Sequence, residues 1–185
     1  LLRIFAGSQY LSDALIRDPD FFEWATLPER LHNTRGREQV EELLRELSLS
    51  CASGDQWANE LRRHKRREIL RIGIRDICLD VPIEEIMEEL SMLAEAALQV
   101  ELERLLRKFE AGRIGDGFCL LAFGKLGGRE LNYSSDIDLL FVARADAGSY
   151  RRLGERLVGA LTRITAEGFL YRVDMRLRPW GQVGP

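Results

Sequence analysis

The sequence is poor in the features that mark secreted, membrane and zinc-binding proteins. Its 185 residues include three cysteines, Cys51, Cys78 and Cys119, which are widely separated and form no Cys-x-x-Cys motif. An odd number of separated cysteines indicates reduced thiols, and with no visible secretory signal we expect a cytoplasmic protein without a zinc site. No apolar run approaches the roughly 20 residues of a membrane helix, so we expect no membrane partner.

An excess of charge of one sign is also lacking. The formal net charge is −3, so the chain as a whole has no attraction for nucleic acid, and we expect no nucleic-acid partner. Both histidines, His32 and His64, stand outside any catalytic motif, and neither is assigned a catalytic role. Hydrophobic residues make up 45% and charged residues 31%, which is typical of a globular protein.

The most informative stretch runs from residue 118 to residue 142. The short apolar run Phe118–Phe123 predicts a buried strand. Gly124, Gly127 and Gly128 follow directly, and such a glycine turn admits positive φ and lets backbone amides approach an anion such as phosphate. A second apolar run, Leu139–Val142, predicts the next strand.

Two acids stand at the start of this second strand. Because side chains two apart in a strand point to the same face, Asp136 and Asp138 are predicted to lie side by side, with Ile137 in the core. Two close carboxylates repel unless a cation lies between them, and Mg²⁺ prefers carboxylate and phosphate oxygens. Asp-x-Asp alone is common at strand ends; the glycine turn before it favours a metal site.

A third acid lies in an alternating segment that predicts a half-buried strand, residues 171–178. We predict that Asp174 shares the metal, while neighbouring arginines contact phosphate oxygens. A solvated edge strand with internal ion pairs is the alternative. The predicted apolar face holds Tyr171, Val173, Met175 and Leu177, and the charged face holds Arg172, Asp174, Arg176 and Arg178.

A Gly-Gly turn, Asp-x-Asp and a later strand acid together resemble the polymerase-β-like nucleotidyltransferase superfamily. Residues 124–139, GKLGGRELNYSSDIDL, and 168–179, GFLYRVDMRLRP, resemble the glutamine synthetase adenylyltransferase family more closely. The helical part before residue 118 is similar to that family as well. The resemblance implies Mg²⁺ as cofactor, with two ions possible, and ATP, ADP and inorganic phosphate as substrates. It also implies glutamine synthetase and the PII signal protein as partners.

The family enzyme carries two related nucleotidyltransferase halves. The loop Leu131–Asp136 is more similar to the N-terminal half, whose reaction is phosphorolytic removal of AMP from an adenylylated tyrosine, giving ADP. The ATP-dependent adenylylating half and a catalytically silent regulatory module remain alternatives, and an antibiotic-modifying nucleotidyltransferase is a third. The chain begins without methionine and stops at Pro185, so we expect a piece of a longer protein, truncated near the end of its core.

The predicted site therefore has a metal part and a phosphate part. Asp136, Asp138 and Asp174 are the predicted catalytic residues and metal ligands. Ser134 and Ser135 are predicted to cap the loop, with phosphate contact as the alternative. For Lys125 and Arg129, surface charge and phosphate contact are weighed equally. The predicted nucleotide- and phosphate-binding residues are Gly127, Gly128, Ser135, Lys125, Arg129, Arg176 and Arg178.

The fold class is predicted as α+β. Residues 1–111 form an all-helical part, and residues 112–185 a mixed-sheet nucleotidyltransferase core, because the hydrophobic period changes from 3.6 to 2 between them. The basic run Arg62–Arg67 is predicted as a solvated face that pairs with acids, with a phosphate- or partner-binding patch as the alternative. Helices are predicted over 1–18, from Pro19, and over 37–49, 56–79, 82–110 and 150–167. Residues 26–36 are predicted to form a loop, and Gly168 is predicted to end the last helix.

Overall fold

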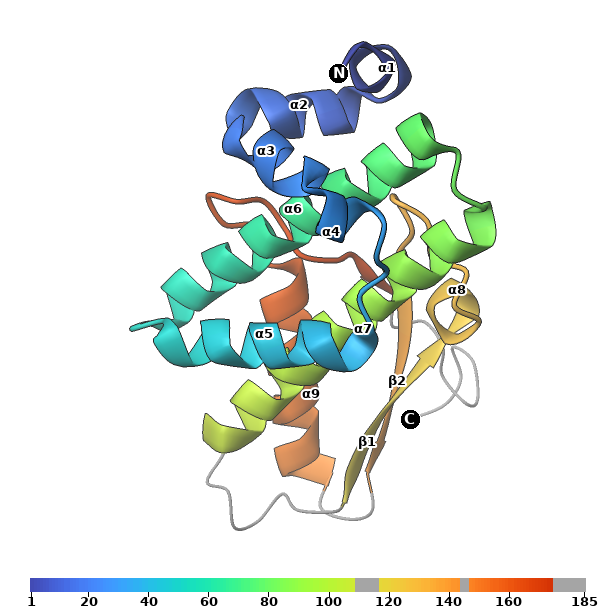
Figure 1. Ribbon diagram of the computed structural model, residues 1–185. Helices are drawn as coiled ribbons and strands as arrows, with labels where there is room; N and C mark the ends of the chain where they lie inside the picture. Colours follow the sequence, from blue (N-terminus) through green and yellow to red (C-terminus); the bar gives the residue numbers. More distant parts are fainter. Residues whose placement is uncertain (109–116, 144–146, 175–185) are drawn as a thin grey trace.

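The structure is a computed structural model that describes residues 1–108, 117–143 and 147–174. These residues form a mostly helical molecule with one small mixed sheet, which confirms the predicted α+β class (Figure 1). The elements are α1 Leu2–Gly7, α2 Gln9–Arg17, α3 Asp20–Thr26, α4 Pro28–Leu31, α5 Arg37–Ser50, α6 Gly54–Leu79, α7 Ile83–Lys108, β1 Phe118–Phe123, α8 Gly124–Gly127, β2 Ile137–Ala143, α9 Ala147–Thr162 and β3 Val173–Asp174.

The first predicted helix is in fact two helices. Ser8 adopts an extended conformation, and its hydroxyl accepts the Leu11 amide at 3.3 Å, so it ends α1 and caps α2. The two helices do not share one apolar face, since Leu11 is buried but Leu2 is 87% and Ile16 69% exposed. Short polar side chains such as serine stop a helix by bonding the backbone, which an apolar periodicity does not report.

The three long helices α5, α6 and α7 form the main helical layer, and each lies within a few residues of its predicted range. Their apolar positions are buried as the 3.6-residue period predicts, for example Leu44, Leu70 and Ile86 at 0% exposure. The basic run in α6 differs from the prediction. Arg62 and Arg66 are buried, because α2, α3 and the chain after α9 cover this face; Arg66 does pair with acids, as predicted.

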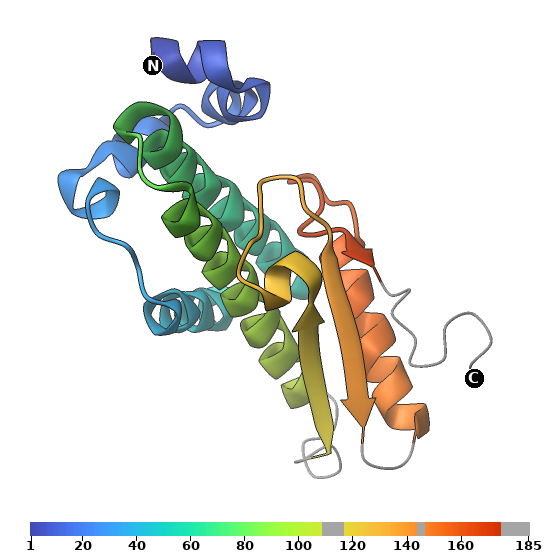
Figure 2. The ribbon, with the colours of Figure 1, turned by 90° about the vertical axis from the view of Figure 1, so that its right-hand side faces the viewer.

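The sheet has the order β1-β2-β3, with β1 and β2 antiparallel and β2 and β3 parallel. Helix α9 contacts β2 and β3 and packs on α7, so the sheet lies beside the helical layer (Figure 2). Buried residues from both predicted parts, such as Leu93, Leu139 and Leu153, belong to one hydrophobic core. The predicted domain boundary lies outside the described residues and stays a prediction.

Helix α9 ends at Thr162, so the prediction that it continues to Glu167 is wrong. The Leu161 carbonyl accepts the amides of Leu170 and Tyr171, which return along the helix end. Gly168, at φ +86°, lies in the turn that follows and does not close the helix. Ile164, just beyond the end of the helix, is 79% exposed.

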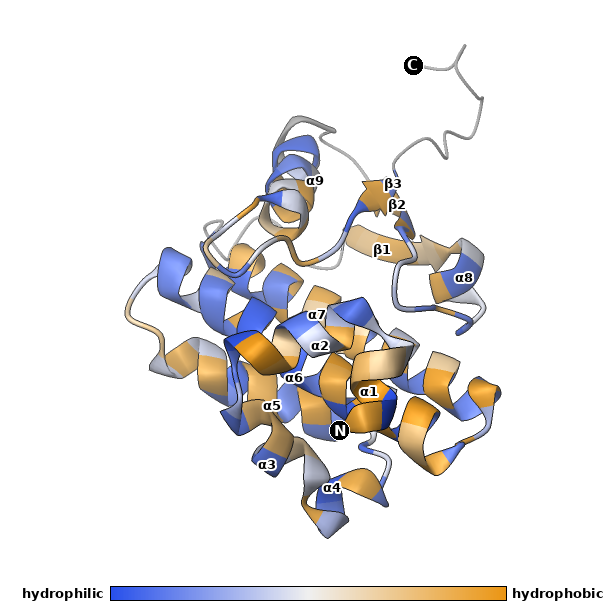
Figure 3. Ribbon diagram, turned by 90° about the horizontal axis from the view of Figure 1, so that it is seen from above, coloured by the Kyte–Doolittle hydropathy of each residue, from blue (hydrophilic) through white to orange (hydrophobic). Residues whose placement is uncertain are grey.

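Hydrophilic and hydrophobic residues both occur around the helices (Figure 3). Within the part of the chain that the structure describes, no helix combines the length and apolar character needed to cross a membrane.

Candidate functional site

The glycine turn that follows β1 includes the short helix α8 and is shaped by close approaches of neighbouring atoms. Gly124 has φ +54°, and a Cβ placed on it would lie 2.2 Å from Oδ2 of Asp138. A Cβ on Gly127 would lie 2.6 Å from the carbonyl oxygen of Ala122. Both distances are shorter than real Cβ atoms show. At Gly127 the obstacle is backbone, and at Gly124 the positive φ strains any other residue, so both positions favour glycine. The Asp138 carboxylate is thereby held directly against the turn.

Two of the three predicted acids are neighbours across strands. Asp138 in β2 is the register partner of Asp174 in β3. Ile137 and Leu139 are fully buried, so the alternation of β2 turns Asp138 to the opposite face, as predicted. Parallel register partners lie on the same face about 5 Å apart, which brings both carboxylates to one place on the sheet.

The third acid, Asp136, immediately precedes β2 and is exposed. Nε of Arg172 donates to its Oδ1 at 2.5 Å, and another guanidinium nitrogen donates to the Ser134 carbonyl at 2.5 Å. Within the described ranges, no group of three acidic, histidine or cysteine side chains is close enough to hold a metal ion. The acids thus share one region of the sheet, and Asp136 is held aside by Arg172.

Several predicted phosphate contacts have structural partners. The Ser135 hydroxyl donates to Oδ1 of Asn132 at 2.6 Å and accepts the Asn132 amide at 3.2 Å, the loop-capping arrangement. Arg129 lies 3.4 Å from Glu88 and 3.7 Å from Glu95 of α7. The Gly128 amide donates to the Gly124 carbonyl at 3.0 Å and is thus engaged within the turn.

The remaining predicted contacts stay predictions. Lys125 is exposed on α8. Arg176 and Arg178 lie outside the described residues, as do Met175 and Leu177 of the predicted apolar face.

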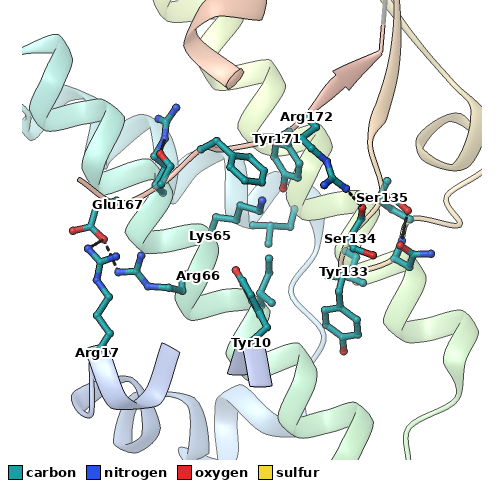
Figure 4. A pocket seen from close by; sticks show the side chains of 18 residues that line it. Tyr10, Arg17, Lys65, Arg66, Tyr133, Ser134, Ser135, Glu167, Tyr171 and Arg172 are labelled. Carbon is teal, nitrogen blue, oxygen red and sulfur yellow. Dashed lines mark hydrogen bonds and ion pairs between the residues drawn. The ribbon is translucent and has the colours of Figure 1, made fainter. Parts of the chain in front are cut away.

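Beside Asp136 the structure has a cavity of about 380 Å³ that sequence reasoning missed. It lies between the helices α2 and α6 on one side and residues 131–135 and 167–172 on the other (Figure 4). Arg172 belongs both to its wall and to the acid site. The charged side chains of its lining are Arg17, Arg62, Lys65, Arg66, Glu167 and Arg172.

Lys65 lies in the middle of this cavity, with Arg17, Arg66 and Glu167 to one side and Arg172 to the other (Figure 4). Its Nζ donates to the Leu170 carbonyl and lies 3.9 Å from the centre of the Tyr171 ring. Burial, and then the positive charges of Arg62 and Arg172, lower the pKa of Lys65 to about 7. In the sequence, the basic run Arg62–Arg67, with its alternative of a phosphate-binding patch, was the only signal for this cavity.

The loop above the cavity is tied to the helical layer. The Tyr133 hydroxyl donates to Oδ2 of Asp76 in α6 at 2.9 Å. Burial, and then the bond to Asp76, raise the pKa of Tyr133, so it remains a neutral donor. The Leu131 amide donates to the Ser91 hydroxyl of α7 at 3.1 Å. These bonds fix the segment that leads into Asp136.

Comparison with known proteins gives the same family that the motifs resemble. The family model described as glutamate-ammonia ligase adenylyltransferase matches residues 1–185. Proteins named bifunctional glutamine synthetase adenylyltransferase/adenylyl-removing enzyme are similar over all or nearly all of this chain. They are 33% identical in Shewanella frigidimarina, 35% in Thioalkalivibrio sulfidiphilus and 32% in Pseudomonas aeruginosa.

The chain spans about a fifth of the length of these relatives, 21% in each of the three. The match nevertheless covers both the helical layer and the sheet that carries the acids. The chain belongs to the glutamate-ammonia ligase adenylyltransferase family.

Proposed function

We propose that this chain carries the acid site for metal-dependent nucleotidyl transfer in an enzyme that regulates glutamine synthetase by reversible adenylylation. The observation that carries the proposal is the pairing of Asp138 with Asp174 across β2 and β3, with the Gly124 turn closed on Asp138. The same arrangement supports membership of the polymerase-β-like superfamily. The names of the relatives support glutamine synthetase as the substrate protein.

The residues present fit a magnesium ion. Asp138 and Asp174 supply two carboxylates from adjacent strands, and Mg²⁺ is bound in enzymes by one or two carboxylates together with substrate phosphates. Asp136 has one oxygen bonded to Arg172, which leaves the other available as a further ligand. When bound, one or two Mg²⁺ ions would neutralise charge on the α-phosphate.

The protein's own groups position the reacting atoms. The Gly124 turn restrains Asp138, and Arg172 restrains Asp136 while linking it to the Ser134 backbone. Arg172 also places a positive charge at the border between the acids and the cavity. Arg176 and Arg178 are proposed to add phosphate contacts, on the alternation of the sequence alone.

We propose removal of AMP by inorganic phosphate as the reaction. The positive lining beside Asp136 favours it, because an attacking phosphate needs more cationic donors than a tyrosine hydroxyl does. The same acids would also serve the ATP-dependent direction, since only the pocket decides which nucleophile is admitted. A silent regulatory module is the remaining alternative. A cytoplasmic location is proposed from the separated cysteines, and the PII signal protein is proposed as a partner from the family resemblance.

The direction is tested with two incubations. Adenylylated glutamine synthetase receives the chain, Mg²⁺ and inorganic phosphate; unmodified glutamine synthetase receives the chain, Mg²⁺ and ATP. We expect ADP in the first and no AMP incorporation in the second. Incorporation in the second without ADP in the first would make this the adenylylating half. Turnover in neither would favour the silent module.

A further inference from the structure

The cavity beside Asp136 has a surplus of positive charge that the protein does not neutralise. Arg17 and Arg66 share Glu167 at 2.9 and 2.5 Å, and Arg66 also pairs with Asp18 at 2.7 Å. Arg172 pairs with Asp136. Lys65 and Arg62, by contrast, form no ion pair with a carboxylate in the described part of the chain.

The partners of these two cations are carbonyl oxygens and a ring. Arg62 donates to the carbonyls of Ala160, Arg163 and Gly168, each at 2.8 Å. Lys65 donates to the Leu170 carbonyl and faces the Tyr171 ring. Carbonyl dipoles hold a guanidinium or ammonium in place but supply no opposite charge. Of the two cations, Arg62 is partly compensated, because the negative charge of Glu101 raises its pKa against the effect of burial. An anion entering the cavity would supply the missing charge.

Two residues that line this cavity, Lys65 and Arg172, retain donors for such an anion. An ammonium group has three N–H bonds, and the two contacts of Lys65 leave one for a ligand. Arg172 uses Nε and one terminal nitrogen for Asp136 and Ser134, which leaves its second terminal nitrogen for the cavity. Arg62 and Arg172 are near enough to Lys65 to lower its pKa, so the three positive charges repel one another until an anion lies among them.

We propose that this cavity binds a phosphate oxyanion between Lys65 and Arg172, with Arg62 supplying additional positive charge. Free inorganic phosphate and the phosphate group of a nucleotide offer the same chemistry. Identifying the anion with the attacking phosphate rests on the proposed function; the binding site itself does not. The position fits that role, because Arg172 contacts Asp136 from the wall of the same cavity.

The test is isothermal titration calorimetry of the whole chain with inorganic phosphate and, separately, with ADP. Divalent metal is left out, so that the acid site does not contribute. Lys65→Met removes the ammonium and keeps the chain length, and we expect it to weaken binding by about tenfold or more, because a hydrogen bond from a charged donor is lost. Lys108→Met, on the last turn of α7 and outside the cavity, is the matched control and should bind as the native chain does.

Lys65→Met removes a charge that burial disfavours, but it also removes the donor to the Leu170 carbonyl, so its melting temperature is measured beside that of the native chain. Should it melt lower, Lys65→Gln is titrated instead. Weaker binding of phosphate identifies free phosphate as the ligand, and weaker binding of ADP alone identifies a nucleotide phosphate. Equal affinities in the native chain and the variant, or no binding of either ligand to the native chain, overturn the proposal.

The test of the binding site and the test of the proposed reaction can give different results. If Lys65→Met weakens phosphate binding but the chain releases no ADP from adenylylated glutamine synthetase, the binding site is supported and the proposed reaction is not. If the chain releases ADP with the same KM for phosphate in the native and Lys65→Met forms, the reaction stands and the binding site is lost.

Discussion

The candidate site acid Asp136 contributes little to the stability of the fold. Its ion pair with Arg172 is exposed on both sides, with the side chains 52% and 58% accessible. Exposed pairs contribute less than about 1 kcal/mol to folding. The bond to Arg172 therefore orients Asp136 rather than stabilising the fold.

Replacing Asp136 should accordingly separate activity from stability. In Asp136→Asn we expect turnover to fall by a factor of about 100 or more, since an acid at the reacting phosphate is lost, with less than about 1 kcal/mol lost from the free energy of unfolding. Urea unfolding measures the change in stability, and the phosphate-dependent release of ADP measures turnover. The control is Asp55→Asn, which breaks a similar exposed pair, 2.9 Å from Arg163, away from the acids and should keep full turnover. Native turnover in Asp136→Asn would remove this residue from the mechanism.

Gly124 makes a second, sharper test at the scale of one residue. In Gly124→Ala the new methyl group meets Oδ2 of Asp138 and the backbone keeps φ +54°, so we expect a loss of about 1–3 kcal/mol in unfolding free energy. Activity should fall further than stability, because Asp138 is displaced. Gly159→Ala in α9 is the control: its Cβ meets nothing within 4 Å, and alanine favours a helix by up to about 1 kcal/mol. A Gly124→Ala protein as stable and active as the native one contradicts this geometry.

At the scale of elements, the sequence predicts some boundaries well and others poorly. Strand β1 has its predicted range, Phe118–Phe123, because a short apolar run is closed by glycine on one side. The sequence does not predict the end of α9, because contacts from distant parts of the chain determine it: the amides of Leu170 and Tyr171 donate to the Leu161 carbonyl, and Arg62 donates to the carbonyls of Ala160 and Arg163. Local periodicity carries no information about such long-range partners.

Arg62 joins α6 to the end of α9, and this joint can be measured. Lysine lacks the planar fork that reaches several carbonyls at once, so Arg62→Lys leaves buried acceptors unpaired. We expect a loss of about 2–4 kcal/mol in the free energy of unfolding, measured by urea denaturation. Arg63→Lys, one residue along α6 and exposed, should change stability by less than about 0.5 kcal/mol. Equal effects of the two substitutions would show that the carbonyl contacts of Arg62 do not hold the joint.

At the scale of the molecule, the acids and the cavity differ in how far the sequence reveals them. Asp136, Asp138 and Asp174 all follow from strand alternation, a local rule. The cavity joins Tyr10, Lys65 and Tyr171 from three distant parts of the chain, so no local pattern could predict it. The basic run of α6 is predicted to be a solvated face, because runs of charged residues usually are. In the structure, α2 and residues 167–172 cover this face, so it forms a wall of the cavity.

Asp138 and Asp174, joined by Asp136, are proposed to form one metal site in the folded molecule. Mn²⁺ replaces Mg²⁺ at oxygen ligands, and electron paramagnetic resonance measures the free ion directly. With ADP present to complete the ligand set, we expect the native chain and Asp55→Asn to bind Mn²⁺ more tightly than ADP alone does.

Asp138→Asn and Asp174→Asn should each weaken this binding by about tenfold or more, because each removes a charged ligand. Melting curves of the same samples establish that the variants are folded. Loss of the bound ion in both folded variants is the result predicted here. Mn²⁺ binding in Asp138→Asn that equals binding in the native chain would contradict the metal site, and with it the account of nucleotidyl transfer.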